Sequence, residues 1–284
     1  MMQTGIDRAP DSPGAIPAGD LDGFRRAQRL AYDAAIEVAA GLAPGVTERE
    51  AASRLRAALA GRGVSRYFHV PFAWFGERSK LAGMRGASPR FFPGRTRLAA
   101  GAIAILDVAP VVDGYIADIG YTFRAPGGSP DDRLERALAA LREIRALLPG
   151  LVARRDTKRS IYVRVERLLR ERGYDNRHAR YPYGVLGHRV ERLPERRRDP
   201  VIAGFGATSL VHLLGAQLRS RLPSMADSSP LWGSGPDADR PLAHGLWAIE
   251  PHLGGDGFGA KFEEILVVEH RSARWLDDDL PHVA

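Results

Sequence analysis

Five residues of this chain have side chains of the types that bind divalent metal ions, and each lies in or beside an apolar segment. Four are carboxylates and one is an imidazole: Asp107, Asp118, His188, Glu250 and Glu263. A lone ion is costly to bury among apolar side chains. A shared metal centre would remove that cost, and bound metal ions can activate water and polarise a carbonyl group. These residue types therefore predict a buried metal centre.

Two of the carboxylates belong to a predicted β-hairpin. The dipeptide Asp113-Gly114 stands between two apolar runs and is typical of a two-residue hairpin turn. With this turn, Ala109 lies opposite Asp118, and Asp107 shares the face of Ala109 because side chains alternate along a strand. The backbones of Asp107 and Asp118 are then diagonal neighbours, roughly 7–8 Å apart. Two carboxylates across such a gap can bind one metal ion or bracket two.

The second acidic pair, Glu250 and Glu263, repeats this arrangement. Both lie at equal distance from the centre of the glycine-rich stretch 254–259, which is predicted to be the hairpin loop. The two carboxylates should therefore face each other across the ladder. Glu264 competes with Glu263 as the ligand, although alternation should point it to the opposite face. His188 follows Gly187 and stands between the two hairpins in the sequence.

The ligand set is rich in oxygen, and the chain contains no cysteine, which excludes disulfides and thiolate ligands. Carboxylate and imidazole ligands favour Mn, Fe or Co over a structural zinc site built from thiolates.

The order of these motifs resembles that of the metal-dependent pita-bread hydrolases, metallopeptidase family M24, over roughly residues 22–276. The motifs are an Asp, a second Asp eleven residues later, Gly-His, Ile-Glu-Pro, and Phe-Glu before an apolar strand. The family includes methionine aminopeptidase, aminopeptidase P, prolidase and creatinase. The resemblance implies an α+β, pseudo-twofold pita-bread fold, two divalent metal ions (Mn, Fe, Co or Zn) and a bridging water or hydroxide as the nucleophile.

The same resemblance implies a hydrolase, and an aminopeptidase or an Xaa-Pro-type peptidase is the expected activity. It also implies a role for each candidate ligand. Asp118 and Glu263 would bridge the ions, and Asp107 would bind one of them. His188 and Glu250 would bind the other. Glu250 would also act as the catalytic proton shuttle.

Two histidines that contact substrate in many peptidases of this family are missing here. Glu195 stands seven residues after His188, where the family usually has a histidine, and residues 84–90 contain no histidine ahead of the first Asp. Two further catalytic candidates follow. His69 lies in an aromatic segment that should run beside the site, and Glu195 could transfer a proton or recognise an amine. Four other histidines are expected to be structural or exposed, namely His178, His212, His244 and His252.

The missing histidines leave the substrate open between a small peptide and another small molecule. The alternative to a peptidase is a pita-bread enzyme that acts on a non-peptide compound by C–N hydrolysis or elimination. A second alternative is a non-catalytic binding module with the same fold, although such relatives usually lose ligands and this chain keeps all five. The glycine-rich stretch 254–259 is followed by a predicted strand, which excludes a dinucleotide fingerprint because that motif opens a helix.

The composition of the chain limits which binding partners and which cellular location are expected. The 284 residues are 44% hydrophobic, and no apolar run reaches the roughly 18–20 residues that a membrane span needs. The polar N-terminus lacks the apolar core of a signal peptide, so a cytoplasmic location and no membrane partner are expected. The net charge is +7, but the arginines alternate with glutamates along predicted helix faces, which disfavours nucleic-acid binding. Oligomeric state stays open, a homodimer included.

The elements that must position these residues can be predicted from caps and periodicity. Residues 1–20 are polar and predict a disordered arm, and residues 21–284 predict a single catalytic domain. Thr47 and Glu50 form a capping box at the start of a second helix, and Ser129-Pro130 is typical of a helix start. The predicted helices cover residues 21–41, 47–59, 129–148 and 157–172, and the segment 78–99 should be irregular.

Overall fold

Helices and antiparallel strands are intermixed along the chain, which confirms the predicted α+β class. The computed structural model describes residues 16–84, 88–194, 199–219, 229–233 and 237–283. Most of the predicted arm, residues 1–15, lies outside this part. The helices are α1 (Ala18–Ala40), α2 (Glu48–Gly61), α3 (Arg133–Ala153), α4 (Lys158–Glu171) and α5 (Ala207–Arg219). Among the described residues, no helix has the length and apolar character to cross a membrane.

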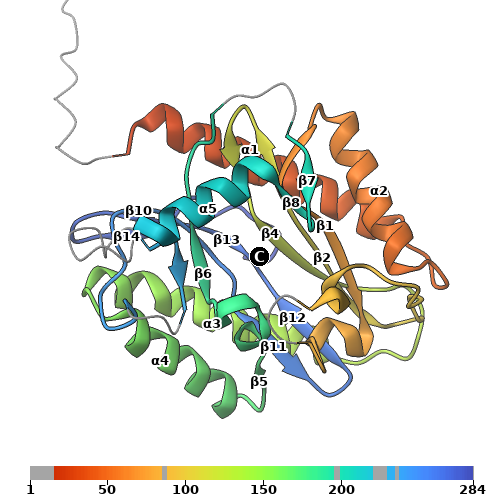
Figure 1. Ribbon diagram of the computed structural model, residues 1–284. Helices are drawn as coiled ribbons and strands as arrows, with labels where there is room; N and C mark the ends of the chain where they lie inside the picture. Colours follow the sequence, from red (N-terminus) through yellow and green to blue (C-terminus); the bar gives the residue numbers. More distant parts are fainter. Residues whose placement is uncertain (1–15, 85–87, 195–198, 220–228, 234–236, 284) are drawn as a thin grey trace, which may run out of the picture.

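The first sheet contains the first acidic hairpin. Its strand order is β3-β2-β1-β8-β7, with β4 also paired to β2. The strands are β1 (Arg66–Phe75), β2 (Ile103–Val112), β3 (Tyr115–Ile116), β4 (Ile119–Arg124), β7 (Val201–Ile202) and β8 (Phe205–Gly206). Helices α1 and α2 cover this sheet (Figure 1), and they bury Phe24, Tyr32 and Leu55 in a core shared with β1 and β2.

The second sheet contains His188 and the parts of both arms of the second acidic hairpin that lie farther from its turn. Its order is β14-β13-β10-β6-β9, and a three-stranded sheet β12-β11-β5 adjoins it. Helix α3 packs against β13 and β14, and α4 lies beside α3 on the same side of the molecule (Figure 1). The strands are β5 (Asp175–Asn176), β6 (Gly187–Val190), β9 (Leu231–Trp232), β10 (Gly245–Ile249), β11 (His252–Gly255), β12 (Phe258–Lys261), β13 (Glu264–Val268) and β14 (Ala273–Trp275).

The first hairpin has the predicted turn and register. Asp113 and Gly114 both have positive φ, at 51° and 85°, as a two-residue turn of the I′ type requires. The ladder pairs Val112 with Tyr115 beside the turn, and Asp107 with Gly120 farther along. The two registers are continuous across the short break between β3 and β4, so Asp118 lies opposite Ala109 as predicted.

The second hairpin has the predicted facing pair but a shorter loop. Ile249 pairs with Glu264, and His252 pairs with Lys261, so Glu250 and Glu263 lie opposite each other between these pairs. The prediction that residues 254–259 form the loop is wrong. Only Asp256 and Gly257 form the turn, because glycines also fit inside strands where side chains of neighbouring segments pack close to the backbone.

Helix α3 starts and ends later than predicted. It begins at Arg133 rather than Ser129, because Arg124 binds the carbonyl oxygens of Ser129 and Asp131 and holds these residues in a loop. The helix also continues through Pro149 to Ala153. Proline lacks the N–H that would bond the carbonyl of Arg145, and the indole of Trp275 donates to that carbonyl instead, at 3.0 Å.

The other helices lie close to their predictions. The capping box at Thr47 is confirmed, and Thr157 caps α4 through the N–H of Ser160. Helix α1 begins at Ala18, three residues before its predicted start. The segment predicted to be irregular contains two short 3₁₀ turns, η1 (Gly76–Lys80) and η2 (Pro89–Phe91).

The side-chain hydroxyl of Thr122 joins the first acidic hairpin to the backbone of the second. The Oγ1 of Thr122 on β4 donates to the carbonyl of Lys261 at 2.7 Å and accepts from its N–H at 2.9 Å. The backbone N–H and C=O of Lys261 both point away from β11. The hydroxyl of Thr122 therefore forms the two hydrogen bonds that a neighbouring strand would otherwise form with them. The bond therefore fixes the end of β12 against the first sheet.

Replacing Thr122 with Val should lower the free energy of unfolding by about 1–3 kcal/mol, because it leaves a buried N–H and a buried C=O of Lys261 unpaired. Urea denaturation measures this change. The matched control Thr122→Ser keeps the hydroxyl and should retain most of the stability. A Val variant as stable as the unmodified protein would show that the hydroxyl does not join the hairpins.

Candidate metal centre

Six buried side chains from the three sheets and from the short segments between their strands form a closed ring in which acidic and basic groups alternate. None of the six is more than 8% exposed. In order around the ring they are Lys261, Asp107, His69, Asp118, His188 and Glu263. The strands that supply or flank them, among them β2, β6, β12 and β13, meet near the middle of the molecule (Figure 1).

The two histidines each stand between two carboxylates. The Nε2 atom of His69 lies 3.3 Å from Oδ1 of Asp107 and 3.1 Å from Oδ1 of Asp118. The Nε2 atom of His188 lies 3.0 Å from Oδ2 of Asp118 and 3.6 Å from Oε1 of Glu263. Asp118 therefore offers one oxygen to each imidazole and stands at the middle of the cluster.

The ammonium group of Lys261 closes the ring on the other side. Its Nζ atom lies 2.6 Å from Oδ2 of Asp107 and 2.8 Å from Oε2 of Glu263. A fourth carboxylate, Glu250, joins the cluster through the same ammonium, with its Oε2 atom at 3.1 Å. The lysine is thus surrounded by three carboxylate oxygens.

Backbone pairing brings the two histidines to these positions. His188 on β6 pairs with Ala248 of β10, two residues before Glu250. His69 on β1 pairs with Ala109, the residue opposite Asp118, and register shifts on either side of His69 mark an irregular strand. Such irregularities re-aim side chains, and they are frequent beside functional sites.

The far ring nitrogens fix the orientation of both imidazoles. Nδ1 of His69 donates to the carbonyl of Val70 at 2.9 Å, and Nδ1 of His188 lies 3.3 Å from the carbonyl of Arg189. In the neutral form this arrangement leaves the Nε2 lone pair facing the carboxylates. A carbonyl that holds the distal N–H in this way is the usual support of a metal-binding histidine. Phe68 also stacks on the ring of His188, with centroids 5.0 Å apart.

Burial and neighbouring charges move the pKa values of the cluster. Burial alone would lower the pKa of His69, but its two carboxylate neighbours outweigh this effect and raise the pKa to about 9. The pKa of His188 is raised in the same way against the effect of burial. Burial raises the pKa of Glu250 to about 8, and the charge of Glu263 adds to the shift. A metal ion at either histidine would have to displace a proton, since a ligating imidazole is neutral.

The arrangement fits a divalent ion at one position in particular. The Oε1 atom of Glu263 is buried and has no hydrogen-bond partner. It converges with Asp118 and His188, and one ligand atom from each lies within 4.8 Å of the others. An unpaired buried carboxylate oxygen is costly, and a cation would compensate it. His69, Asp107 and Asp118 form a second group of the same kind.

The structure brings together most of the predicted site residues. Asp107, Asp118, His188 and Glu263 converge, and Glu250 reaches the cluster through Lys261 rather than through either three-residue group. His69, which was predicted as a catalytic candidate, is one of the six members of the ring. Glu195 lies outside the described residues.

Glu264 is directed away from the cluster, as strand alternation predicts. It is fully buried, and its carboxylate pairs with Arg145 at 2.5 Å and with His282 at 3.0 Å. Of the two adjacent glutamates, only Glu263 can therefore contribute to the centre.

Lys261 is the member of the ring that the sequence analysis missed. A usable signal was present, because a residue two positions before Glu263 on an extended segment shares its face. Tyr181 and His252 were also missed as supports. The ring of Tyr181 lies 5.2 Å from Nζ of Lys261, and its hydroxyl bonds Nδ1 of His252 at 2.8 Å. His252 in turn donates from Nε2 to the carbonyl of Ser79 at 2.7 Å.

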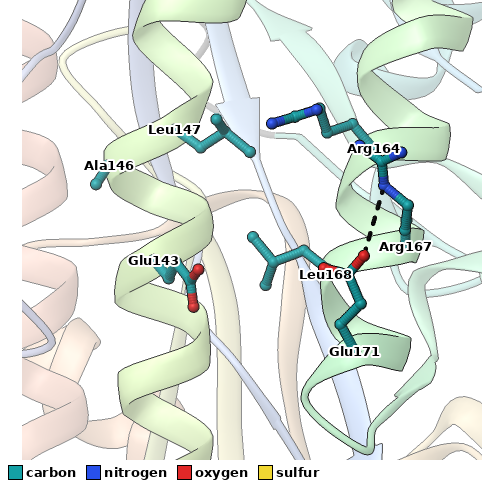
Figure 2. Close-up of a pocket in the computed structure, with 7 residues that line it drawn as sticks. All are labelled: Glu143, Ala146, Leu147, Arg164, Arg167, Leu168 and Glu171. Atoms are coloured by element: carbon teal, nitrogen blue, oxygen red, sulfur yellow. Dashed lines mark ion pairs between the residues drawn. The ribbon is translucent and has the colours of Figure 1, made fainter.

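A cavity of about 390 Å³ lies elsewhere, between helices α3 and α4 (Figure 2). An ion pair between Arg167 and Glu171, at 3.8 Å, lies along its edge. No member of the ring lines it, so it is separate from the candidate centre. The lining residues are Glu143, Ala146, Leu147, Arg164, Arg167, Leu168 and Glu171.

Residues 22–270 match the sequence model of metallopeptidase family M24. No curated protein matches the chain. Among solved structures, an X-Pro aminopeptidase from Thermotoga maritima is similar, with 18% sequence identity, a TM-score of 0.63, and coverage of 95% of this chain and 63% of that one.

Two further structures show the same likeness. A dipeptidase from Mycobacterium ulcerans is 21% identical with a TM-score of 0.61, covering 94% of this chain and 59% of its own. The prolidase from Pyrococcus furiosus is 17% identical with a TM-score of 0.59, covering 92% and 64%. The chain therefore spans about three fifths of the length of these proteins. Their shared architecture confirms the predicted pita-bread fold.

The two adjacent glutamates give a paired test of the centre. Glu263→Gln should abolish the rise in melting temperature that MnCl₂ produces, because it removes a ligand oxygen. Glu264→Gln should lower the free energy of unfolding by about 3 kcal/mol, since it breaks a buried ion pair, yet keep the response to MnCl₂. Differential scanning fluorimetry measures both. A normal MnCl₂ response in the Glu263 variant would place the ion elsewhere.

Proposed function

This chain belongs to metallopeptidase family M24, and we propose that it is a metal-dependent hydrolase that cleaves small peptides as an aminopeptidase or an Xaa-Pro-type peptidase. One observation carries the proposal. Asp118, His188 and Glu263 converge in a buried site, and the Oε1 atom of Glu263 there has no hydrogen-bond partner. The predicted cofactor, two divalent ions from among Mn, Fe, Co and Zn, is part of this proposal.

Bound divalent ions would lower the pKa of water towards about 7 and polarise the scissile carbonyl. The chain's own residues would arrange the rest of the reaction. Asp118 holds both histidines, and the carbonyls of Val70 and Arg189 keep their Nε2 atoms turned inward. The buried aromatic ring of Phe68 shields one side of the His188 imidazole from water.

Glu250 is the group that we assign to proton transfer. Its carboxyl lies beside the ring rather than inside either three-residue group, and its one described polar partner is Lys261. A buried carboxyl with a raised pKa can hold a proton and release it near neutral pH. His69 lies across Asp107 and Asp118, where it would orient the carboxylates and face the substrate.

The choice of a peptide substrate rests on the names of the similar structures, which are an X-Pro aminopeptidase, a dipeptidase and a prolidase. Because these proteins are longer than this chain, the substrate belongs to the proposal. A cytoplasmic location and a homodimer stay predictions.

A peptide panel tests the proposed activity. Metal-loaded protein should release the N-terminal residue from Xaa-Pro dipeptides or from peptides that begin with Met, measured by chromatography of the products. His188→Ala should reduce kcat/KM about 100-fold or more, because it removes an inner ligand. His212→Ala is the matched control, since that imidazole pairs with Glu191 outside the ring, and it should leave turnover unchanged.

Three other results would revise the proposal in different ways. Full activity of His188→Ala would reject the metal centre as the catalytic site. Bound metal with no turnover of any peptide would favour the non-peptide substrate. Absence of bound metal from the purified protein and after MnCl₂ addition would favour the non-catalytic module.

A further inference from the structure

Lys261 differs chemically from the other two basic members of the ring. A neutral imidazole can exchange its carboxylate partner for a metal ion, because Nε2 then offers a lone pair. An ammonium group has three donors and no lone pair, so it cannot become a ligand. A metal ion that approaches the oxygens around Nζ must therefore compete with Lys261 rather than bind it.

The lysine side chain occupies a closely fitting site. Its stem crosses Gly120 on β4, where an added Cβ would lie 2.5 Å from the lysine Cε atom. The hydroxyl of Thr122 fixes its backbone, and the ring of Tyr181 lies against its ammonium. The side chain is 1% exposed. The surrounding residues therefore hold the ammonium in place between the carboxylates.

The two outer carboxylates of the ring are not equally available to a metal ion. Asp107 has both oxygens engaged, Oδ1 with His69 and Oδ2 with Lys261 at 2.6 Å. Glu263 gives only Oε2 to Lys261 at 2.8 Å, and its Oε1 atom has no hydrogen-bond partner and lies 3.6 Å from Nε2 of His188. An ion at Asp118, His188 and Glu263 can therefore bind while Lys261 stays in place.

A second ion would have to bind carboxylate oxygens that are already paired. It could use the group of His69, Asp107 and Asp118, or the three oxygens that now surround Nζ. Both positions require Asp107. An ion at the first would share the Asp107 carboxylate with the ammonium, and an ion at the second would take the place of the ammonium itself.

We infer that Lys261 is a resident cation that competes with one metal ion for Asp107, so that the centre binds one ion tightly beside His188 and a second ion weakly. This inference rests on the proposed function, because it assumes a metal-binding centre. Lys261 thereby sets the metal concentration at which the second ion is bound.

Calorimetric titration with MnCl₂, after removal of metal by a chelator, tests the inference in three variants. The unmodified protein should bind one Mn²⁺ and then a second with a Kd at least tenfold higher. Lys261→Met should tighten the second Kd at least tenfold. Lys261→Arg keeps the positive charge and should behave like the unmodified protein. Lys80→Met is the control for net charge, because Lys80 pairs with Glu77 outside the ring.

The Met variant leaves buried carboxylates uncompensated without metal, so it is purified with MnCl₂ present. Its Mn content after dialysis, measured by elemental mass spectrometry, should be two ions per chain against one for the unmodified protein. If the Met variant does not fold even then, the titration of the unmodified protein still tests the inference, because two ions of equal affinity there would overturn it.

The other outcomes of these titrations distinguish failure of the inference from failure of the proposed function. Two ions of equal affinity in the unmodified protein, or an unchanged second Kd in the Met variant, would overturn the role of Lys261 and leave the proposed function intact. No Mn²⁺ bound by any variant would overturn the proposed function, and the inference with it.

Discussion

Compensation of buried negative charge is the constraint on which the rest of this structure depends. Asp107, Asp118, Glu250 and Glu263 lie almost without solvent contact, and an uncompensated buried carboxylate costs several kcal/mol. The ring meets this cost by placing a basic group between each pair of acids. One buried oxygen of the ring, Oε1 of Glu263, has no hydrogen-bond partner and lies 3.6 Å from Nε2 of His188, and we propose that an external cation binds there.

Both acidic hairpins contribute carboxylate oxygens to the ring. Each hairpin turns on two residues and places its acidic pair face to face or diagonally, with small residues where another segment crosses. Thr122 joins the hairpins at the backbone of Lys261, and the irregular pairing of β1 turns His69 inward. Local turn chemistry, strand register and charge compensation thus specify the same site.

Sequence reasoning could predict the parts of this arrangement that depend on local rules. The Asp113-Gly114 turn, the register that sets Asp118 opposite Ala109, and the capping box at Thr47 all follow from short-range geometry. The start of α3 and its passage through Pro149 could not be predicted, because they depend on Arg124 and on the indole of Trp275, which comes from a distant strand. The spacing of Lys261 from Glu263 indicates which face it lies on, but the position of its ammonium group depends on Gly120 and Tyr181, which only the folded chain brings together.

The most direct test of the central claim is a crystal structure of protein soaked in MnCl₂, with anomalous diffraction recorded at the manganese absorption edge. We expect a strong anomalous peak within coordination distance of Oδ2 of Asp118, Nε2 of His188 and Oε1 of Glu263. A map with no peak among these three atoms, and with the strongest peak at the protein surface, would contradict it.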